Sequence, residues 1–136
     1  MFIYEHKGIR VRYADTDQMG YVYYGVYAQY YEVGRVEAMR MLGFSYKQVE
    51  ERGILMPVID FTISYKKPAF YDDEVTVVTY MRERPNGLRL VFDYECFNAA
   101  GDLLNTGKVT LVLIAKATNK MCKIPDWFQK GFDPFF

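Results

Sequence analysis

The most informative stretch of the sequence runs from Arg12 to Tyr27 and reads RYADTDQMGYVYYGVY. It places two carboxylates, Asp15 and Asp17, in a short polar loop that ends at Gly20. An aromatic segment follows, and from about residue 24 the apolar residues recur every three or four positions, which predicts a helix. The acidic loop therefore leads directly to a helix N-terminus, where unpaired backbone amides favour negative charge.

The sequence predicts that this helix covers residues 24–42. One stripe carries its apolar and small residues, which are Tyr27, Tyr30, Tyr31, Gly34, Ala38, Met41 and Leu42. Gly43 is placed to end the helix, because glycine readily adopts the left-handed conformation of a helix C-terminus. Ser45 and Gln48 have the spacing of a capping box and predict a second, short helix that ends at Gly53.

The rest of the chain has the alternating pattern of β-strands. Strands are expected over residues 2–13, 54–67, 74–84, 88–98 and 103–115. Pro57 indicates a bulge or an edge position, and Asn86-Gly87 is typical of a tight primed turn. The tail from Lys116 is expected to end in a short helix or an irregular cap around residues 124–128. This order predicts an α+β domain, an antiparallel sheet with one dominant helix.

The length and composition exclude several classes of protein. The 136 residues suit a single domain over residues 1–136, with 51% hydrophobic and 18% aromatic residues. Seventeen basic residues balance seventeen acidic ones, so we expect no nucleic-acid binding. No stretch of about 18 apolar residues exists, and we expect no membrane association. One helix cannot cover both faces of the sheet, so self-association is expected.

The residues available for catalysis point to carboxylates and backbone groups. His6 is the only histidine, which argues against Ser-His-Asp catalysis, Cys-His catalysis and histidine-rich metal sites. Cys96 and Cys122 lack the spacing of metal ligands and indicate a reduced, cytoplasmic protein, with Cys96 a small core residue.

The two carboxylates of the polar loop have two interpretations. They are either solvated loop residues at a helix start, or one of them is chemically active. Beside unpaired helix amides that stabilise an oxyanion, an Asp can act as a general base or as a nucleophile.

The residues quoted above also carry a resemblance. The motif Asp-x-Asp-x-x-Gly, the aromatic helix start, and the later Tyr30, Tyr31, Glu32 and Arg35 resemble the signature of hotdog-fold acyl-CoA thioesterases of the 4-hydroxybenzoyl-CoA thioesterase type. Residues 65–69 (YKKPA) and 72–75 (DDEV) match the strand, turn and strand in the middle of that family. The likeness covers roughly residues 8–115. It implies a hotdog fold, a long central helix wrapped by a curved antiparallel sheet of about five strands.

The resemblance also implies a function and a site. It implies hydrolysis of an acyl-CoA thioester to the free acid and coenzyme A, with Asp17 as the catalytic carboxylate and Asp15 structural. The backbone amides near Tyr24 and Gly25 would polarise the thioester carbonyl. The site would lie where two subunits of a homodimer or homotetramer meet, and no metal or redox cofactor is expected.

Further residues are candidates for substrate binding. Those expected around the acyl group are Gly20, Val22, Tyr27, Tyr31, Met56 and Asp60, the last of which either faces the pocket or pairs across the sheet. Strand-end cations expected to hold the phosphates of coenzyme A, or to be merely solvated charges, are Lys66, Lys67, Arg84 and Arg89. Glu32 lies three residues before Arg35, a spacing that predicts an intrahelical ion pair.

Alternative functions remain open from the sequence. A hydratase or dehydratase of the same fold would need a histidine in the site, and this chain has only His6. A non-catalytic module that binds an acyl or aromatic ligand, or a thioesterase acting on acyl carrier protein, also fits the pattern. Saturable binding of acyl-CoA without release of free thiol would identify the binding module. The acyl group, its carrier and the choice between dimer and tetramer are not determined.

Overall fold

The computed structural model describes residues 1–136. Its elements in chain order are β1 (Phe2–Arg10), η1 (Tyr13–Asp15), η2 (Tyr24–Val26), α1 (Tyr27–Met41), α2 (Tyr46–Glu51), β2 (Ile54–Leu55), β3 (Val58–Tyr65), β4 (Glu74–Met81), β5 (Arg89–Phe97), β6 (Leu103–Ala115), β7 (Lys120–Cys122), α3 (Asp126–Lys130) and η3 (Asp133–Phe135). None of the helices has the length and apolar character needed to cross a membrane.

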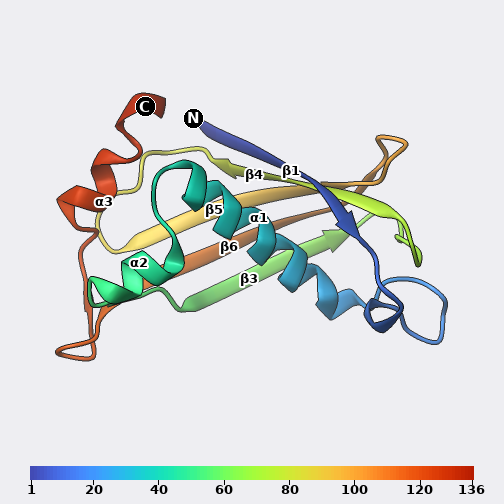
Figure 1. Ribbon diagram of the computed structural model, residues 1–136, viewed down its shortest axis with the longest axis horizontal. Helices are drawn as coiled ribbons and strands as arrows, with labels where there is room; N and C mark the ends of the chain where they lie inside the picture. The colour runs from blue at the N-terminus through green and yellow to red at the C-terminus, as the bar shows by residue number, and fades with distance from the viewer.

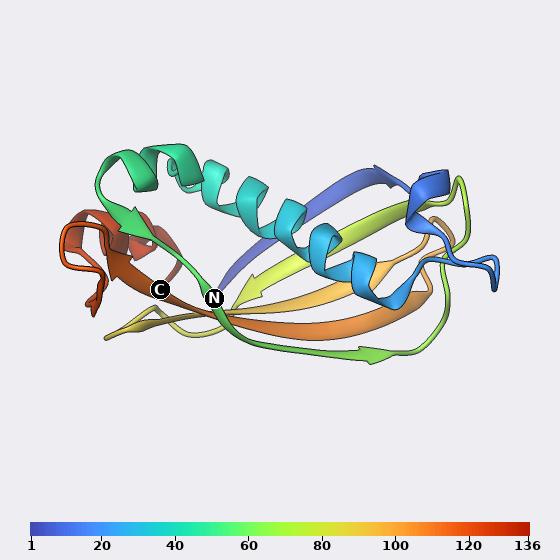
Figure 2. The ribbon, with the colours of Figure 1, turned by 90° about the horizontal axis from the view of Figure 1, so that it is seen from below.

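The strands form one antiparallel sheet of seven strands, with α1 lying along it (Figure 1). The order is β1-β4-β5-β6-β2, and β3 and β7 also pair with β6. Five strands are long, and β2 and β7 are short additions at one end. The sheet curves around α1, which lies on its concave side (Figure 2). The predicted α+β architecture is confirmed, and the expected count of about five strands matches the five long strands but misses the two short ones.

The hydrophobic core lies between α1 and the sheet. Strand β5 shows the predicted alternation, because Leu90, Phe92, Tyr94 and Cys96 are all buried under the helix. Strand β4 alternates in the same way. Apolar side chains on one face of a strand supply most of the free energy that holds a helix against a sheet.

Two glycines allow the helix and the sheet to approach closely. A Cβ atom added to Gly34 of α1 would lie 2.8 Å from Val77 Cγ1 and 2.8 Å from Thr79 Oγ1 of β4. One added to Gly107 of β6 would lie 2.3 Å from Cε2 of Tyr31, a side chain of α1. The Tyr31 ring stacks on Tyr94 of β5, with ring centroids 4.4 Å apart and planes 6° apart.

The helical region follows the sequence prediction with three exceptions. Met41, assigned to the apolar stripe, is 69% exposed, and Met39 is buried in its place. Residues 24–26 form a turn of 3₁₀-helix rather than the first turn of α1. The predicted ion pair between Glu32 and Arg35 is wrong, since Arg35 is buried and donates instead to the hydroxyls of Tyr46 at 2.6 Å and Tyr94 at 3.0 Å. Glu32 lies on the exposed face of the helix, so the two side chains point to different environments.

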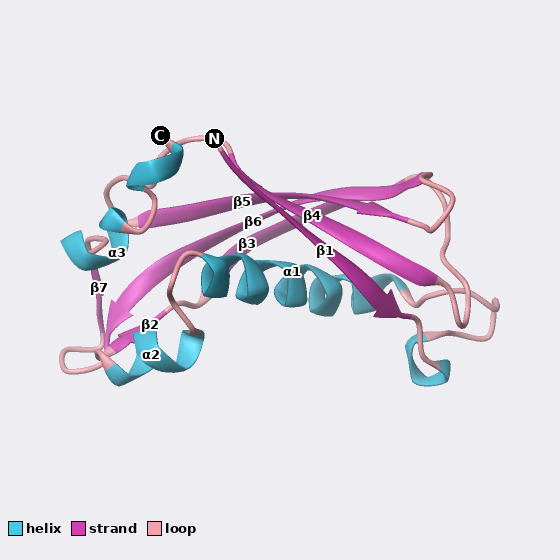
Figure 3. Ribbon diagram, turned by 45° about the horizontal axis from the view of Figure 1, so that its top comes forward, coloured by secondary structure: helices cyan, strands magenta, loops and turns pink.

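The helix ends are as predicted. Gly43 has a φ of +93° after α1, and the predicted capping box at the start of α2 is present. The Gln48 amide donates to Ser45 Oγ at 3.0 Å, and the Ser45 amide donates to Gln48 Oε1 at 3.0 Å. Two short helices, α3 and η3, close the C-terminal end of the chain, and Figure 3 shows the C-terminus beside the N-terminus.

Several strands are shorter than predicted. The first strand ends at Arg10, because the chain then turns into η1 and leaves the sheet. The strand expected over residues 54–67 is divided into β2 and β3 around Pro57, which has no amide hydrogen to donate. The predicted primed turn at Asn86-Gly87 is wrong in detail, since Gly87 has a positive φ of 74° and Asn86 does not.

Strand β3 is an edge strand that carries exposed apolar side chains. It pairs only with β6, and the register shifts between Val58 and Asp60, as Pro57 indicated. The exposed fractions are 48% for Val58, 51% for Ile59 and 38% for Phe61. An unpaired edge with this composition can take up a further strand.

Candidate active site

The loop before the helix is held in place by Asp15. Asp15 is only 4% exposed. Its Oδ2 accepts hydrogen bonds from the Arg12 amide at 3.0 Å and from the Tyr30 hydroxyl at 2.9 Å. Its carbonyl accepts from the Tyr23 amide at 2.9 Å. Burial and the neighbouring Asp15 carboxylate raise the pKa of Tyr30. These contacts hold the loop against α1. The Asp15 carboxylate is therefore used for structure, as predicted.

Asp17 has a different environment on the same loop. Its Oδ1 accepts from the Met19 amide at 2.8 Å, and its carbonyl accepts from the Gly20 amide at 3.0 Å. Gly20 has a φ of +88°, so this tight turn favours glycine at that position. The second carboxylate oxygen, Oδ2, accepts no hydrogen bond, and Asp17 is half-buried without an ion-pair partner. One oxygen is therefore fixed and the other is free to contact a bound molecule.

The helix start presents free backbone donors. Tyr23 is extended, the 3₁₀ turn begins at Tyr24, and α1 follows at Tyr27. No side chain caps this end, and the amides of Tyr24 and Gly25 donate to no backbone group. The N-terminus of a helix carries partial positive charge, so these amides can stabilise an oxyanion that forms in front of them.

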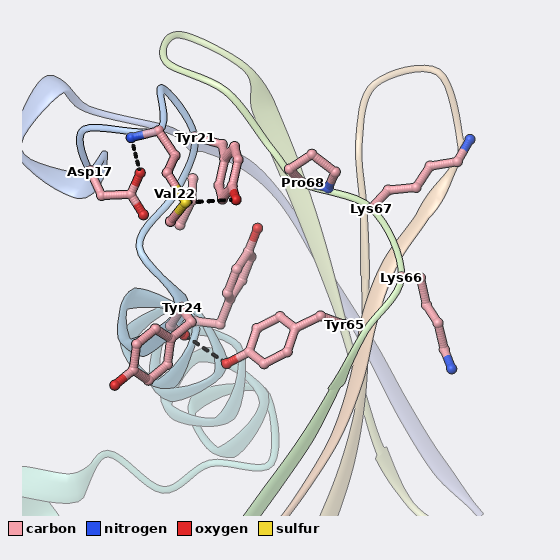
Figure 4. A pocket seen from close by; sticks show the side chains of 10 residues that line it. Asp17, Tyr21, Val22, Tyr24, Tyr65, Lys66, Lys67 and Pro68 are labelled. Atoms are coloured by element: carbon pink, nitrogen blue, oxygen red, sulfur yellow. Dashed lines mark hydrogen bonds between the residues drawn. The ribbon is translucent and has the colours of Figure 1, made fainter.

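A cavity of about 380 Å³ joins these two features (Figure 4). Its lining residues are Asp17, Met19, Tyr21, Val22, Tyr24, Tyr27, Tyr65, Lys66, Lys67 and Pro68. The loop and helix start form one wall, and the end of β3 with the following turn forms the other. Burial raises the pKa of Tyr27 to about 12, so this side chain stays uncharged at neutral pH. The cavity combines one carboxylate and two lysines with aromatic walls.

The structure brings part of the predicted set together. The carboxylate of Asp17 and the side chains of Val22, Tyr24 and Tyr27 line the cavity together with the two lysines. Lys67 also contacts Asp102, with Nζ and Oδ2 3.6 Å apart. Gly20 and Gly25 are neighbours of lining residues in the chain without lining the cavity themselves.

Besides Gly20, three predicted acyl-binding residues lie outside this cavity. Tyr31 is completely buried beneath α1, where its hydroxyl donates to Asn105. Met56 lies between β2 and β3, at the end of β3 opposite to Lys66. Asp60 points to the other face of the sheet, since its neighbour Phe61 packs toward Tyr31 on the helix side and successive strand residues alternate.

The predicted coenzyme A cluster is also divided within the chain. Lys66 and Lys67 donate their amides to the Leu104 carbonyl near the start of β6, whereas Arg89 pairs with Val112 near its end. Eight residues of extended strand separate these positions, roughly 26 Å. Arg84 forms an ion pair with Asp133 and, with Arg89, borders a second cavity of about 390 Å³. Within one chain the four cations therefore form two separate pairs at opposite ends of the sheet, and their binding of coenzyme A stays a prediction.

Four lining residues are absent from the site predicted from the sequence. They are Met19, Tyr21, Tyr65 and Pro68. Tyr65 and Pro68 flank the two lysines in the 65–69 segment, so a strand end next to paired cations was the available signal. No group of three or more His, Cys, Asp or Glu side chains is arranged to hold a metal ion.

Comparisons with known proteins agree on one family. A family model described as the thioesterase-like superfamily matches residues 11–132. The chain is 40% identical over 126 residues to YneP of Bacillus subtilis (strain 168), covering 93% of this chain and 88% of that protein. It is 34% identical over 120 residues to the acyl-CoA thioester hydrolase YbgC of Escherichia coli O157:H7, covering 86% of this chain and 87% of that protein.

A solved structure gives the same result for the fold. The DHNA-CoA thioesterase from Staphylococcus aureus superposes with a TM-score of 0.90 and 38% sequence identity, covering 98% of this chain and 91% of that chain. The family match includes the Asp17 loop, α1 and all long strands except β1. The resemblance seen in the sequence is thus confirmed, and the chain belongs to the thioesterase-like superfamily and has its hotdog fold.

Proposed function

We propose that this protein hydrolyses acyl-CoA thioesters to a free acid and coenzyme A. The observation that carries the proposal is the cavity in which the free oxygen of Asp17 and the uncapped start of α1 lie together. Membership of the thioesterase-like superfamily supports the reaction type. Hydrolysis by a carboxylate and backbone amides needs no metal or redox cofactor, and we propose none.

In the proposed reaction, Asp17 acts on the thioester carbonyl in one of two ways. As a general base it takes a proton from water, and the water oxygen attacks the carbonyl carbon. As a nucleophile it attacks directly and forms a mixed anhydride, which water then hydrolyses. In both cases the carbon–sulfur bond breaks, the thiolate leaves and a proton returns to the sulfur.

The backbone amides at Tyr24 and Gly25 would bind the oxyanion that forms on the carbonyl oxygen. Neither amide donates to another backbone group, so neither has to break a hydrogen bond when the charge develops. Removing one such donor typically costs about 10²–10³ in kcat. The aromatic wall of Tyr21, Tyr27 and Tyr65 would exclude water around the acyl group.

Lys66 and Lys67 are the proposed contacts for the phosphates of coenzyme A in this chain. Both lie at the mouth of the cavity after β3, and Figure 4 shows their amino groups pointing in different directions. Arg84 and Arg89 would belong to the same ligand only if a second subunit brought them close. Their contribution is therefore tied to the oligomeric state.

We also propose a homo-oligomer, a dimer or a tetramer, formed through the free edge of β3. The exposed apolar residues of this strand include Val58, Ile59 and Phe61, and a second β3 can pair with it. The edge ends at Tyr65, a lining residue, so the site would lie at the subunit boundary. Light scattering behind size-exclusion chromatography measures this state directly, and a strictly monomeric protein would contradict the proposal.

The function is tested by measuring the release of free thiol. The substrates are a panel of aromatic, short-chain and long-chain acyl-CoAs, with thioesters of acyl carrier protein as a further arm. We expect Asp17→Asn to lower kcat by about 10²–10⁴-fold, the range of general acid–base catalysis. Asp126→Asn, at an exposed position of α3, is the matched control and should retain full activity. Saturable acyl-CoA binding without thiol release would contradict hydrolysis, and an unchanged kcat in Asp17→Asn would contradict the assigned carboxylate.

A further inference from the structure

A tyrosine hydroxyl reaches across the cavity to the backbone of the helix start. Tyr65, the last residue of β3, donates to the carbonyl oxygen of Tyr24 at 2.9 Å (Figure 4). The two residues are 41 positions apart in the chain. No side chain caps the helix, and this is the one side-chain hydrogen bond to the backbone of residues 24–27. The end of β3 is thus connected directly to the proposed oxyanion site.

The bonded carbonyl belongs to the same peptide unit as the Gly25 amide. A trans peptide is planar, and its N–H and C=O point in opposite directions. Fixing the Tyr24 oxygen therefore also fixes the direction of the Gly25 hydrogen. A hydrogen bond accepted by the carbonyl further polarises the unit and strengthens the amide as a donor. Gly25 needs such a constraint more than other residues, because glycine has the widest conformational freedom.

We propose that Tyr65 is a positioning residue, whose hydroxyl orients and polarises the Tyr24–Gly25 peptide so that the Gly25 amide can bind the oxyanion. The inference rests on the proposed hydrolysis and deepens it, since it assigns a function to a residue of the opposite wall. It also distinguishes the two candidate amides. The Tyr24 amide belongs to the preceding peptide, which this bond does not touch, so Gly25 is the donor that Tyr65 controls.

The hydroxyl can be removed without disturbing the packing of the ring. The ring of Tyr65 lies beside Tyr27, with centroids 5.8 Å apart, and Tyr65→Phe keeps this contact. Tyr80→Phe is a matched control, because it also removes one tyrosine hydroxyl. The Tyr80 hydroxyl donates to the Glu95 side chain and not to the backbone of the helix start. Tyr80 lines neither the proposed active site nor the helix start.

The experiment compares the kinetics of the two variants with those of the full-length wild type. For Tyr65→Phe we expect kcat to fall about tenfold, with KM within about twofold and an unchanged melting temperature. The reason is that the hydrogen bond from the Gly25 amide to the oxyanion, which forms only in the transition state, is weakened. Tyr80→Phe should leave kcat and KM unchanged. In nuclear magnetic resonance spectra of the ligand-free protein, the Gly25 amide resonance should move in Tyr65→Phe and stay in place in Tyr80→Phe.

The possible outcomes separate this inference from the proposed function. A raised KM with unchanged kcat would mean that the hydroxyl binds substrate, and would overturn the positioning role. Unchanged kinetics together with a fixed Gly25 resonance would also overturn it, while an inactive Asp17→Asn left the proposed function standing. If the wild type hydrolysed no thioester, the proposed function would fail, and the Gly25 resonance would still show whether Tyr65 holds the peptide.

Discussion

Replacing Gly34 with alanine tests how closely α1 approaches the sheet. In an isolated helix this change is favourable, since alanine stabilises a helix interior by about 0.8–1.0 kcal/mol relative to glycine. Here the new methyl group would lie 2.8 Å from both Val77 Cγ1 and Thr79 Oγ1. Carbon atoms in ordinary contact are about 3.5–4.0 Å apart, so the neighbours or the helix must move by several tenths of an ångström.

The steric cost of the added methyl group decides whether Gly34→Ala raises or lowers the free energy of unfolding. Overpacking a well-filled core typically costs about 1–3 kcal/mol, and the upper part of this range applies because Val77 and Thr79 are β-branched and stiff. Subtracting the helix propensity leaves Gly34→Ala less stable by about 1–2 kcal/mol. For a chain of this size we expect the melting temperature to fall by roughly 4–8 °C.

Urea denaturation followed by far-ultraviolet circular dichroism measures the change in the free energy of unfolding. A double-mutant cycle identifies its source, because Val77→Ala removes one of the two obstructing groups. Gly34→Ala combined with Val77→Ala should be less destabilised than the sum of the single changes by about 1 kcal/mol or more. A variant Gly34→Ala that is more stable than wild type, or a cycle that is strictly additive, would refute the close approach.

Three further outcomes are expected. Tyr94→Phe removes an acceptor from the buried Arg35 guanidinium and should lower the free energy of unfolding by about 1.5–3 kcal/mol in urea denaturation, and unchanged stability would contradict that bond. Burial raises the pKa of Cys96 to about 12, so the folded state keeps a proton that the unfolded thiol loses above its ordinary pKa of about 8.5. Between about pH 8.5 and 10, before the buried tyrosines with raised pKa values contribute, stability should therefore fall by up to about 1.4 kcal/mol per pH unit. A Cys96→Ala variant that keeps the full slope in this range would show that another group is responsible. Phe61→Lys, on the free edge of β3, should shift the oligomer toward monomer in light scattering, and an unchanged mass would place the interface elsewhere.

The sequence predicts the elements whose signals are local. Gly43 and the Ser45–Gln48 capping box mark helix ends through short-range hydrogen bonds and backbone conformation. The alternation of β5 predicts its buried face residue by residue, because a strand has a fixed period of two. The loop of Asp17 was identifiable because the acidic turn and the helix start are adjacent in the chain.

The errors concern features that tertiary packing decides. Arg35 donates hydrogen bonds to Tyr46 and Tyr94 rather than pairing with Glu32. The residue spacing within α1 gives no sign that these two tyrosine hydroxyls lie next to the buried guanidinium. Arg84 and Arg89 resemble Lys66 and Lys67 as strand-end cations, and only the strand directions place them at the opposite end of the sheet. The face of Asp60 likewise depends on the register shift in β3.

Asp15 has a consequence for the motion of the site. Through its side chain and its carbonyl it accepts hydrogen bonds from Arg12, Tyr23 and Tyr30, so three segments of the chain are held to one residue. Relative motion of the Asp17 loop and the helix start would therefore have to break hydrogen bonds to a buried carboxylate, which is costly. The buried Asp15 thus limits how far the Asp17 loop can move away from the helix start, although Asp15 itself does not line the cavity.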